Sequence, residues 1–228
     1  MRPLRKTVGM ALYLLGLALA AALACLVLFR PQWFDARVTL FFCMGYFLVA
    51  VLAGYVYICR EDSLATKGRA AKGSVWLLFL VYVILLVAIL FAETYREEAA
   101  RMGLRQYAGS HINLTPFASI RRYFPEAFQP GNTAATLNLV GNLLLFVPMG
   151  VFLPALMKWQ RHTVAFLLTM LAMLACVELG QLYLQVGYCD VDDILLNMTG
   201  ALAAYLTTKL RIVKKLGARV YLWEARAY

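Results

Sequence analysis

Long runs of hydrophobic residues, separated by short polar segments, dominate the first part of the chain. Three of these runs hold no formally charged residue, and they cover Val8–Phe29, Val38–Cys59 and Gly73–Ala92. A helix that crosses a bilayer needs about 20 mostly apolar residues, and each run is long enough. The pattern therefore predicts three membrane-spanning helices within residues 1–92. The first run is too long for a signal peptide, so we expect it to be retained as a helix.

The hydrophobic runs in the second half of the chain include polar residues. A fourth span is predicted at Leu137–Met157, where two prolines indicate a kink. A fifth span is predicted at Thr163–Val186, with Glu178 inside it, and a sixth at Asp193–Leu210, after the acidic turn Asp190–Asp193. The predicted fold is therefore all-α: a polytopic membrane protein with six transmembrane helices, of which the last three occupy residues 137–210.

The composition agrees with a membrane protein. Hydrophobic residues make up 63% of the chain and charged residues 15%, whereas a soluble domain has roughly 45–50% apolar and about 25% charged residues. The formal net charge of +10 raises the question of a nucleic-acid partner. The basic residues, however, lie in short segments beside hydrophobic runs and not along one soluble face. We therefore expect membrane lipids as partners and no nucleic acid.

The lysine and arginine residues predict the orientation of the spans, because short basic segments stay in the cytoplasm. They gather in alternate connections, whereas the connection between the fifth and sixth spans has none and that between the first and second has only Arg30 and Arg37. The basic groups are Arg2, Arg5 and Lys6 before the first span, Lys67, Arg69 and Lys72 before the third, Lys158 and Arg161 before the fifth, and the tail 211–228 after the sixth. Both termini are therefore predicted to be cytoplasmic.

This orientation places the long segment 93–136 outside the cytoplasm. Two short helices are predicted in it. Glu97–Tyr107 has the composition of a solvated helix, and a second helix begins with Thr115 as the N-cap and Pro116 as the first helical residue. Apolar, aromatic and basic side chains alternate along the second helix. Since this mixture suits the boundary between water and lipid, we expect the helix to lie on the outer membrane surface.

Polar side chains recur in all three C-terminal spans at similar depths. A charged side chain at the centre of a bilayer costs about 2.5–3.5 kcal/mol on insertion scales, so such residues need polar partners. Helices that carry polar stripes are expected to turn them toward one another. The sequence therefore predicts a polar cavity that opens outward. Its predicted ligand-binding residues are Asn138, Asn142, Glu178, Gln181, Asp190, Asp192, Asp193 and Asn197.

Four short motifs follow one another from residue 113 onward: Asn113–Phe117, Asn138–Asn142 followed by Phe146–Gly150, Glu178–Gln181, and Asp190–Asp193 with Asn197 and Gly200. Taken in order, they resemble the motifs of the VanZ-like family. The resemblance covers residues 113–210 and implies a multi-pass protein of the bacterial plasma membrane. The family's namesake is associated with resistance to the glycopeptide teicoplanin. The resemblance also adds Asn113 to the predicted ligand-binding residues.

The chain departs from the family pattern at two places. Many relatives have a small hydroxyl residue just before the glutamate of the fifth span, where this chain has Cys176–Val177. Many also have an arginine before the acidic turn, where this chain has Gly187–Tyr188. A cationic partner for Asp190 must then come from another segment. Arg121 and Arg122, in the extracytoplasmic segment, are the candidates.

Three functions are compatible with these residues. In the first, the cavity binds an envelope lipid, a lipid-linked cell-wall precursor or a glycopeptide, and so contributes to teicoplanin-type resistance. In the second, the protein is a membrane enzyme that modifies a lipid or cell-wall precursor, with Glu178 and Asp193 as catalytic candidates, acting as an acid/base pair or as ligands of Mg²⁺ or Mn²⁺. The third is transport or scaffolding. Each polar residue has a purely structural alternative as an interhelical hydrogen-bond partner. No dedicated cofactor or metal site is predicted.

Overall fold

The computed structural model describes residues 64–91, 104–127, 129 and 133–219, together with residues 11, 14–16, 18, 19 and 22. The predicted spans Val8–Phe29 and Val38–Cys59 therefore lie largely or wholly outside the described residues. The chain divides into two compact units, one formed by residues 1–88 with 210–228 and the other by residues 89–209. The motifs of the C-terminal half all belong to the second unit.

The described part of the first unit consists mainly of two helices. Helix α3 covers Leu64–Leu90, and its last two residues belong to the second unit. Its stretch Lys67–Leu90 is long and apolar enough to cross a membrane. This stretch contains most of the third predicted span, and the helix begins nine residues before Gly73 because no proline interrupts the basic segment. The short helix α12 covers Arg211–Arg219 in the predicted tail.

The fourth predicted span is a helix with a break. A π-helical turn, η2 (Leu137–Gly141), leads into α8 (Asn142–Leu145), and α9 (Val147–Leu156) follows after Phe146. Phe146 leaves the helical conformation, with φ −100° and ψ 3°. Pro148 follows two residues later, and a proline has no N–H with which to continue the helical ladder. The kink predicted from the prolines of this span therefore has a counterpart at Phe146.

Two further helices complete this part of the second unit. After a 3₁₀ turn, η3 (Lys158–Arg161), helix α10 covers Thr163–Leu184 and ends at Gln185, a residue in the left-handed region with φ 56°. Helix α11 covers Val191–Thr207. Three helical stretches among the described residues are long and apolar enough to cross a membrane: Lys67–Leu90, Asn138–Leu156 and Thr163–Leu184. Helix α11 has 17 residues and is shorter than these stretches.

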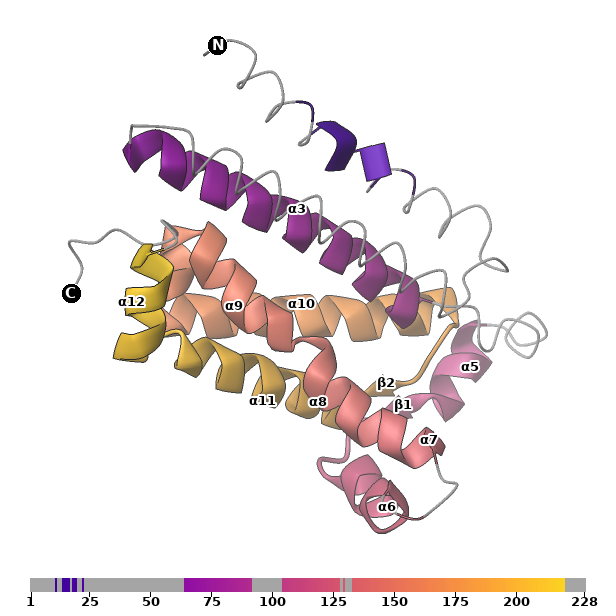
Figure 1. Ribbon diagram of the computed structural model, residues 1–228. Coiled ribbons are helices and arrows are strands. Elements are labelled where there is room, and N and C mark those ends of the chain that lie inside the picture. Colours follow the sequence, from indigo (N-terminus) through magenta and orange to yellow (C-terminus); the bar gives the residue numbers. More distant parts are fainter. Residues whose placement is uncertain are drawn as a thin grey trace. The chain divides into compact units, whose positions relative to one another are not determined.

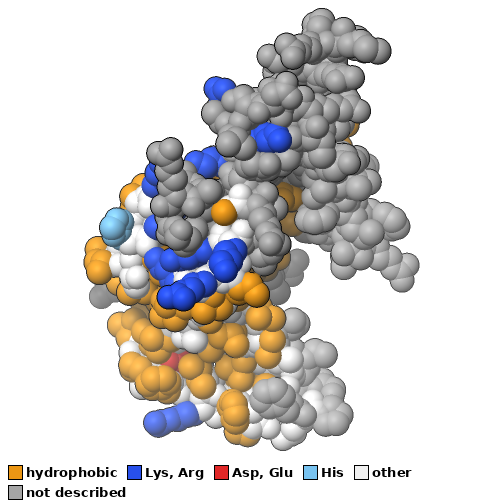
Figure 2. Space-filling model, turned by 60° about the vertical axis from the view of Figure 1, so that its left-hand side comes forward, with side chains coloured by type: hydrophobic (Ala, Val, Ile, Leu, Met, Phe, Trp, Pro, Cys, Tyr) orange, Lys and Arg blue, Asp and Glu red, His pale blue; other side chains and the backbone are white. Residues whose placement is uncertain are grey.

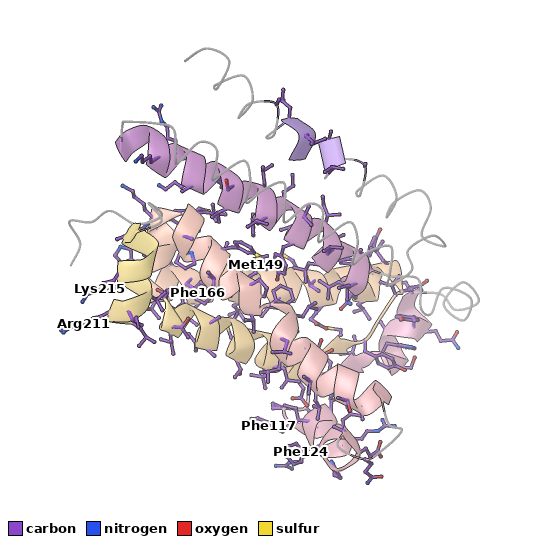
Figure 3. All side chains as sticks on the ribbon, viewed as in Figure 1. Phe117, Phe124, Met149, Phe166, Arg211 and Lys215 are labelled. Carbon is purple, nitrogen blue, oxygen red and sulfur yellow. The ribbon has the colours of Figure 1, made fainter. Side chains whose placement is uncertain are left out.

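Helix α11 packs closely against α8 and α9 because two glycines remove side chains from the contact. A Cβ atom on Gly200 would lie 1.8 Å from the carbonyl oxygen of Leu143, and one on Gly150 would lie 2.2 Å from that of Ala201. Figure 1 shows α11 beside α8, α9 and α10. Met149 and Phe166 point into the space between these helices (Figure 3), where both are buried.

The described part of the segment between α3 and η2 is mostly helical and joins the turn between α10 and α11. Its elements are α5 (Leu104–Ser110), the two-residue strand β1 (Ile112–Asn113), α6 (Ala118–Ala127) and α7 (Thr133–Thr136). A separate apolar cluster of Ala127, Ala135 and Leu139 joins α6, α7 and η2. Strand β1 pairs in parallel with β2 (Cys189–Asp190), so that Asn113 lies opposite Asp190. Two segments that are 77 residues apart therefore lie side by side.

The structure corrects the predicted start of the second short helix. Thr115 is not its N-cap and Pro116 is not its first residue, because α6 begins at Ala118 and Phe117 has a positive φ of 63°. The first predicted helix, Glu97–Tyr107, overlaps α5 only at residues 104–107, and its residues 97–103 lie outside the described part.

Large apolar side chains are exposed along the membrane-length helices. On α10 they include Val164, Leu168, Leu171 and Leu179, each at least half exposed. Orange hydrophobic side chains also cover much of the described surface in Figure 2. Such a surface is unfavourable in water and favourable in lipid hydrocarbon. Phe117 and Phe124 are 51% and 61% exposed, and Figure 3 shows both at α6. They give α6 an apolar surface beside its basic one.

Candidate functional site

The second unit contains a cavity of about 710 Å³ where α6, η2, α8 and the turn before α11 meet. Its lining is mixed, with amide, hydroxyl and charged side chains on some walls and apolar side chains on others. The polar lining residues are Ser110, Asn113, Ser119, Arg122, Tyr123, Asn138, Asn142, Gln181, Tyr188, Asp190 and Asp193. Several of them, including Ser110, Arg122 and Tyr188, are exposed and form the rim of the cavity.

Seven of the residues predicted to bind a ligand line this cavity. They come from four segments that are distant in sequence, and they are Asn113, Arg122, Asn138, Asn142, Gln181, Asp190 and Asp193. The other four predicted residues, Arg121, Glu178, Asp192 and Asn197, are not among the lining residues. The structure therefore brings the polar stripes together around one space.

Asp190 begins helix α11 and also ties it to the segment before α6. As the N-cap residue, Asp190 accepts a hydrogen bond from the backbone N–H of Asp192 at 2.9 Å. Its carboxylate also accepts hydrogen bonds from Asn113 Nδ2, at 3.1 Å, and from the Ser119 hydroxyl. The donors that reach Asp190 are thus neutral groups, whereas Arg121 and Arg122 were the predicted candidates for a cationic partner.

Asp192 is fully buried and caps a helix other than its own. Its Oδ1 accepts a hydrogen bond from the backbone N–H of Phe117 at 2.6 Å. Its Oδ2 accepts from the N–H groups of Ser119 and Ile120, at 2.8 and 3.1 Å. The first turn of a helix has N–H groups without partners, and a carboxylate also interacts favourably with the helix dipole there. Asp192 therefore sets the position of α6.

Glu178 is buried on α10 and supports the acidic turn from below. Its Oε2 accepts a hydrogen bond from the backbone N–H of Asp190 at 2.9 Å. The side chain is 4% exposed. A carboxylate in the apolar interior needs such a donor, since an unpartnered one is costly. Glu178 thus positions Asp190, which lines the cavity, but is not itself a lining residue.

Asp193 and the asparagines of the fourth span form a second polar group. Asn142 Nδ2 donates to Asp193 Oδ1 at 2.5 Å, and Asn197 Nδ2 donates to the backbone carbonyl of Asp193 at 2.8 Å. The side-chain oxygens of Asn138 and Asn197 are buried and have no hydrogen-bond partner in the described part of the chain. Asn138 is a lining residue of the cavity, but its unpartnered Oδ1 atom is itself buried.

The remaining predicted residues lie at the edges of the site. Gln181 Nε2 donates to the carbonyl oxygen of Leu90 at 2.7 Å, which connects α10 to the end of α3. Arg121 and Arg122 are exposed on α6. The guanidinium carbon of Arg122 lies 5.6 Å from the centre of the Tyr123 ring, a cation–π distance. Of these two arginines, Arg122 borders the cavity.

Sequence reasoning missed Ser119 and the aromatic side chains of the rim. Ser119 contacts both aspartates of the turn, because its hydroxyl donates to Asp190 and its N–H donates to Asp192. Serine is common near the start of a helix, so the residues around Ser119 did not indicate this role. Tyr123 and Tyr188 had no distinguishing pattern either. Their positions follow from the pairing of β1 with β2 and from the cap on α6.

Cys189 lies beside the acidic groups in the turn before α11. Burial raises the pKa of its thiol, and the negative charges of Glu178 and Asp190 raise that pKa further. The described residues contain no group of three or more histidine, cysteine, aspartate or glutamate side chains placed to hold a metal ion. The described residues that line the cavity offer amides, hydroxyls, two carboxylates and one guanidinium.

Comparison with known proteins supplies the family. No curated protein and no solved structure matches the chain. The family model described as VanZ/LLP1 matches residues 79–213, which is more than half of the 228 residues. The match begins within α3, before the first of the four motifs, and includes every residue that lines the cavity. On this evidence the chain belongs to the VanZ/LLP1 family.

Proposed function

We propose that this VanZ-family membrane protein uses its polar cavity to bind an envelope lipid, a lipid-linked cell-wall precursor or a glycopeptide. It does so at the outer side of the bacterial plasma membrane, with six spans and both termini in the cytoplasm. By this binding the protein contributes to resistance against glycopeptides of the teicoplanin type.

The observation that carries this proposal is the cavity itself. A polar space of about 710 Å³ lies among the ends of helices whose outward surfaces are apolar. Binding sites for small molecules are concave, with a few convergent polar groups among apolar walls. Here the amides and carboxylates come together beside Ile89, Leu90 and Val186, so the lining suits a molecule with both a polar and an apolar part.

Basic residues at the other end of the helices support the orientation. Lys209, after α11, donates a hydrogen bond from Nζ to the carbonyl oxygen of Arg161, which lies between α9 and α10. Lys158 lies in the same 3₁₀ turn as Arg161. Short segments rich in lysine and arginine are retained in the cytoplasm, so the opposite end, with the cavity, faces outward.

The proposal is tested by teicoplanin susceptibility in a strain that lacks the gene. Expression of the wild-type chain is expected to lower susceptibility, and the cavity variants Asn138→Leu and Asp193→Asn are expected to abolish that effect. Glu126→Gln is the matched control, since Glu126 is exposed on α6 and does not line the cavity. Immunoblots of the membrane fraction establish equal abundance. Full protection by both cavity variants at equal abundance would refute the proposal.

The second candidate is an enzyme that modifies a lipid or cell-wall precursor, and the position of Asp193 favours it. Of the two catalytic candidates from the sequence, Asp193 lines the cavity and Glu178 does not. Asp193 would then act as the acid/base group on a bound precursor. Incubation of the purified protein with lipid-linked precursors, followed by mass spectrometry, tests this activity. Unchanged precursors under conditions in which they bind would exclude it.

A further inference from the structure

Among the described residues that line the cavity, the charges do not balance. They include two carboxylates, Asp190 and Asp193, and one guanidinium, that of Arg122. Asp190 is satisfied by three donors, whereas the donor that reaches the Asp193 carboxylate in the described part of the chain is the neutral amide of Asn142. A partly buried carboxylate without a cation is costly. A positive group on the ligand would therefore be favourable at Asp193.

Asn138 lines the same cavity but offers a ligand no exposed acceptor. It precedes Asn142 by four residues, and its buried Oδ1 has no partner among the described residues. A protonated primary amine carries three N–H donors and no acceptor. One ammonium group can thus donate to the Asp193 carboxylate. A quaternary ammonium, which has no N–H, or a neutral hydroxyl satisfies this wall less well.

The cation of the cavity lies at its rim. Arg122 is exposed, whereas Asn138 and Asp193 are partly buried. A guanidinium binds a phosphate through paired N–H donors, which makes arginine well suited to phosphodiesters. The apolar lining residues Ile89, Leu90, Ile112 and Val186 give the carbon part of an amphiphile a surface to contact. The charges are thus ordered from positive at the rim to negative inside.

We propose that the cavity selects a ligand in which a protonated primary amine is linked to a phosphate, such as the aminoethyl phosphate headgroup of a phospholipid. The amine binds Asp193, and the phosphate binds Arg122. This inference rests on the proposed function and defines the ligand of the same cavity. A lipid-linked cell-wall precursor with a free peptide amine and a pyrophosphate carries the same chemistry, so the experiment must distinguish these two sources.

Native mass spectrometry of the full-length protein in detergent tests the inference. The probes are phosphatidylethanolamine, its trimethylated analogue phosphatidylcholine, and phosphatidylglycerol, all with the same acyl chains. The wild-type protein is expected to bind phosphatidylethanolamine at least about tenfold more tightly than the other two lipids. A tenfold difference in affinity corresponds to the lower end of the free energy that a hydrogen bond to a charged group contributes. Asp193→Asn should remove this preference. Arg122→Gln should weaken the binding of all three lipids. Glu126→Gln should change neither the preference for phosphatidylethanolamine nor the affinity for any of the lipids.

The outcomes separate this inference from the proposed function. Equal affinity for the three lipids, or a preference that survives Asp193→Asn, overturns the amine–phosphate ligand. If a neutral glycolipid or a glycopeptide binds instead and depends on Asn138, the inference fails while the proposed function stands. Competition by an amine-bearing precursor with the same dependence on Asp193 supports the chemistry and assigns its source. A thermal melting measurement on each variant establishes that it is folded.

Discussion

The three carboxylates of the acidic turn before α11 have different structural roles, although they are close in sequence. Asp190 caps its own helix, Asp192 caps α6, and Asp193 lines the cavity beside Asn142. The sequence predicted that these side chains would meet polar partners, because hydrocarbon offers none. It could not assign the tasks, since the partners of Asp192 are backbone N–H groups more than 70 residues earlier. The amino-acid type of a residue does not indicate which distant backbone N–H groups will donate to it.

Replacing Asp192 with alanine is expected to loosen the start of α6. The substitution leaves the N–H groups of Phe117, Ser119 and Ile120 without their acceptor, and lost buried hydrogen bonds of this kind cost about 1–3 kcal/mol. Hydrogen exchange of residues 117–120, followed by mass spectrometry, should be faster in the variant. Glu126→Ala is the control on the same helix. Unchanged exchange in Asp192→Ala would contradict the capping role.

The pKa of the Cys189 thiol depends on its burial and on the charges around the turn. Its pKa is raised, so the reactive thiolate forms only at higher pH than for an ordinary cysteine. In a chain whose other four cysteines are replaced, labelling by a maleimide should therefore be slow near pH 8 and rise steeply above it. Glu178→Gln removes one negative charge, lowers the pKa and should accelerate labelling at pH 8. An equal or slower rate in Glu178→Gln would contradict this electrostatic account.

At the scale of elements, the close contact of α11 with α8 and α9 holds the walls of the cavity in place. Gly200 and Gly150 allow the backbones to touch, and the carbonyl oxygen of Leu143 occupies the space that a side chain on Gly200 would need. Small residues at helix contacts are a general means of packing helices in lipid. Not every glycine of these helices serves this purpose, because a Cβ atom on Gly141 would lie in open space.

Gly200→Ala is expected to destabilise the protein and Gly141→Ala to leave its stability nearly unchanged. An added Cβ atom would lie 1.8 Å from a backbone oxygen at Gly200, whereas nothing lies within 4 Å at Gly141. Overpacking of this kind costs about 1–3 kcal/mol, or more where backbone must move. Thermal melting of the two variants in the same detergent measures the difference. Equal melting temperatures would show that α11 can shift without cost.

The bounds of the helices were predictable to within a few residues where the hydrophobic pattern alone determines them. The fifth span ends at Leu184, two residues before the predicted end, whereas α7 runs directly into η2, so this helix begins at Thr133, four residues before the predicted Leu137. The start of α6 was mispredicted from the local pattern of Thr115 and Pro116. The acceptor for the first N–H groups is instead Asp192, which is distant in sequence. The pairing of β1 with β2 was also beyond local pattern, since two-residue strands leave no periodicity.

For the whole molecule, the pairing of β1 with β2 requires that Asn113 and Asp190 occupy the same side of the helices. The basic residues around Arg161 and Lys209 lie at the other end of α10 and α11. The predicted sidedness of the C-terminal half agrees with this arrangement. The six spans and the cytoplasmic termini remain predictions, because the first two spans lie outside the described residues.

Cysteine labelling in whole cells tests the orientation. In a cysteine-free chain, Leu114→Cys and Tyr188→Cys are expected to react with a membrane-impermeant maleimide, since both side chains are exposed beside the cavity end. Lys158→Cys and Lys215→Cys should react only after the membrane is permeabilised, because basic segments are retained in the cytoplasm. Labelling of Leu114→Cys and Lys158→Cys from the same side would overturn the predicted topology.

The cap that Asp192 provides has a consequence for biosynthesis. Residues 117–120 leave the ribosome long before residue 192, and membrane segments emerge in order from the N-terminus. Until the last hydrophobic segment is translated, the amino end of α6 lacks its acceptor. The rim of the cavity therefore assembles last, so the nascent chain passes through the translocation machinery without a finished binding pocket.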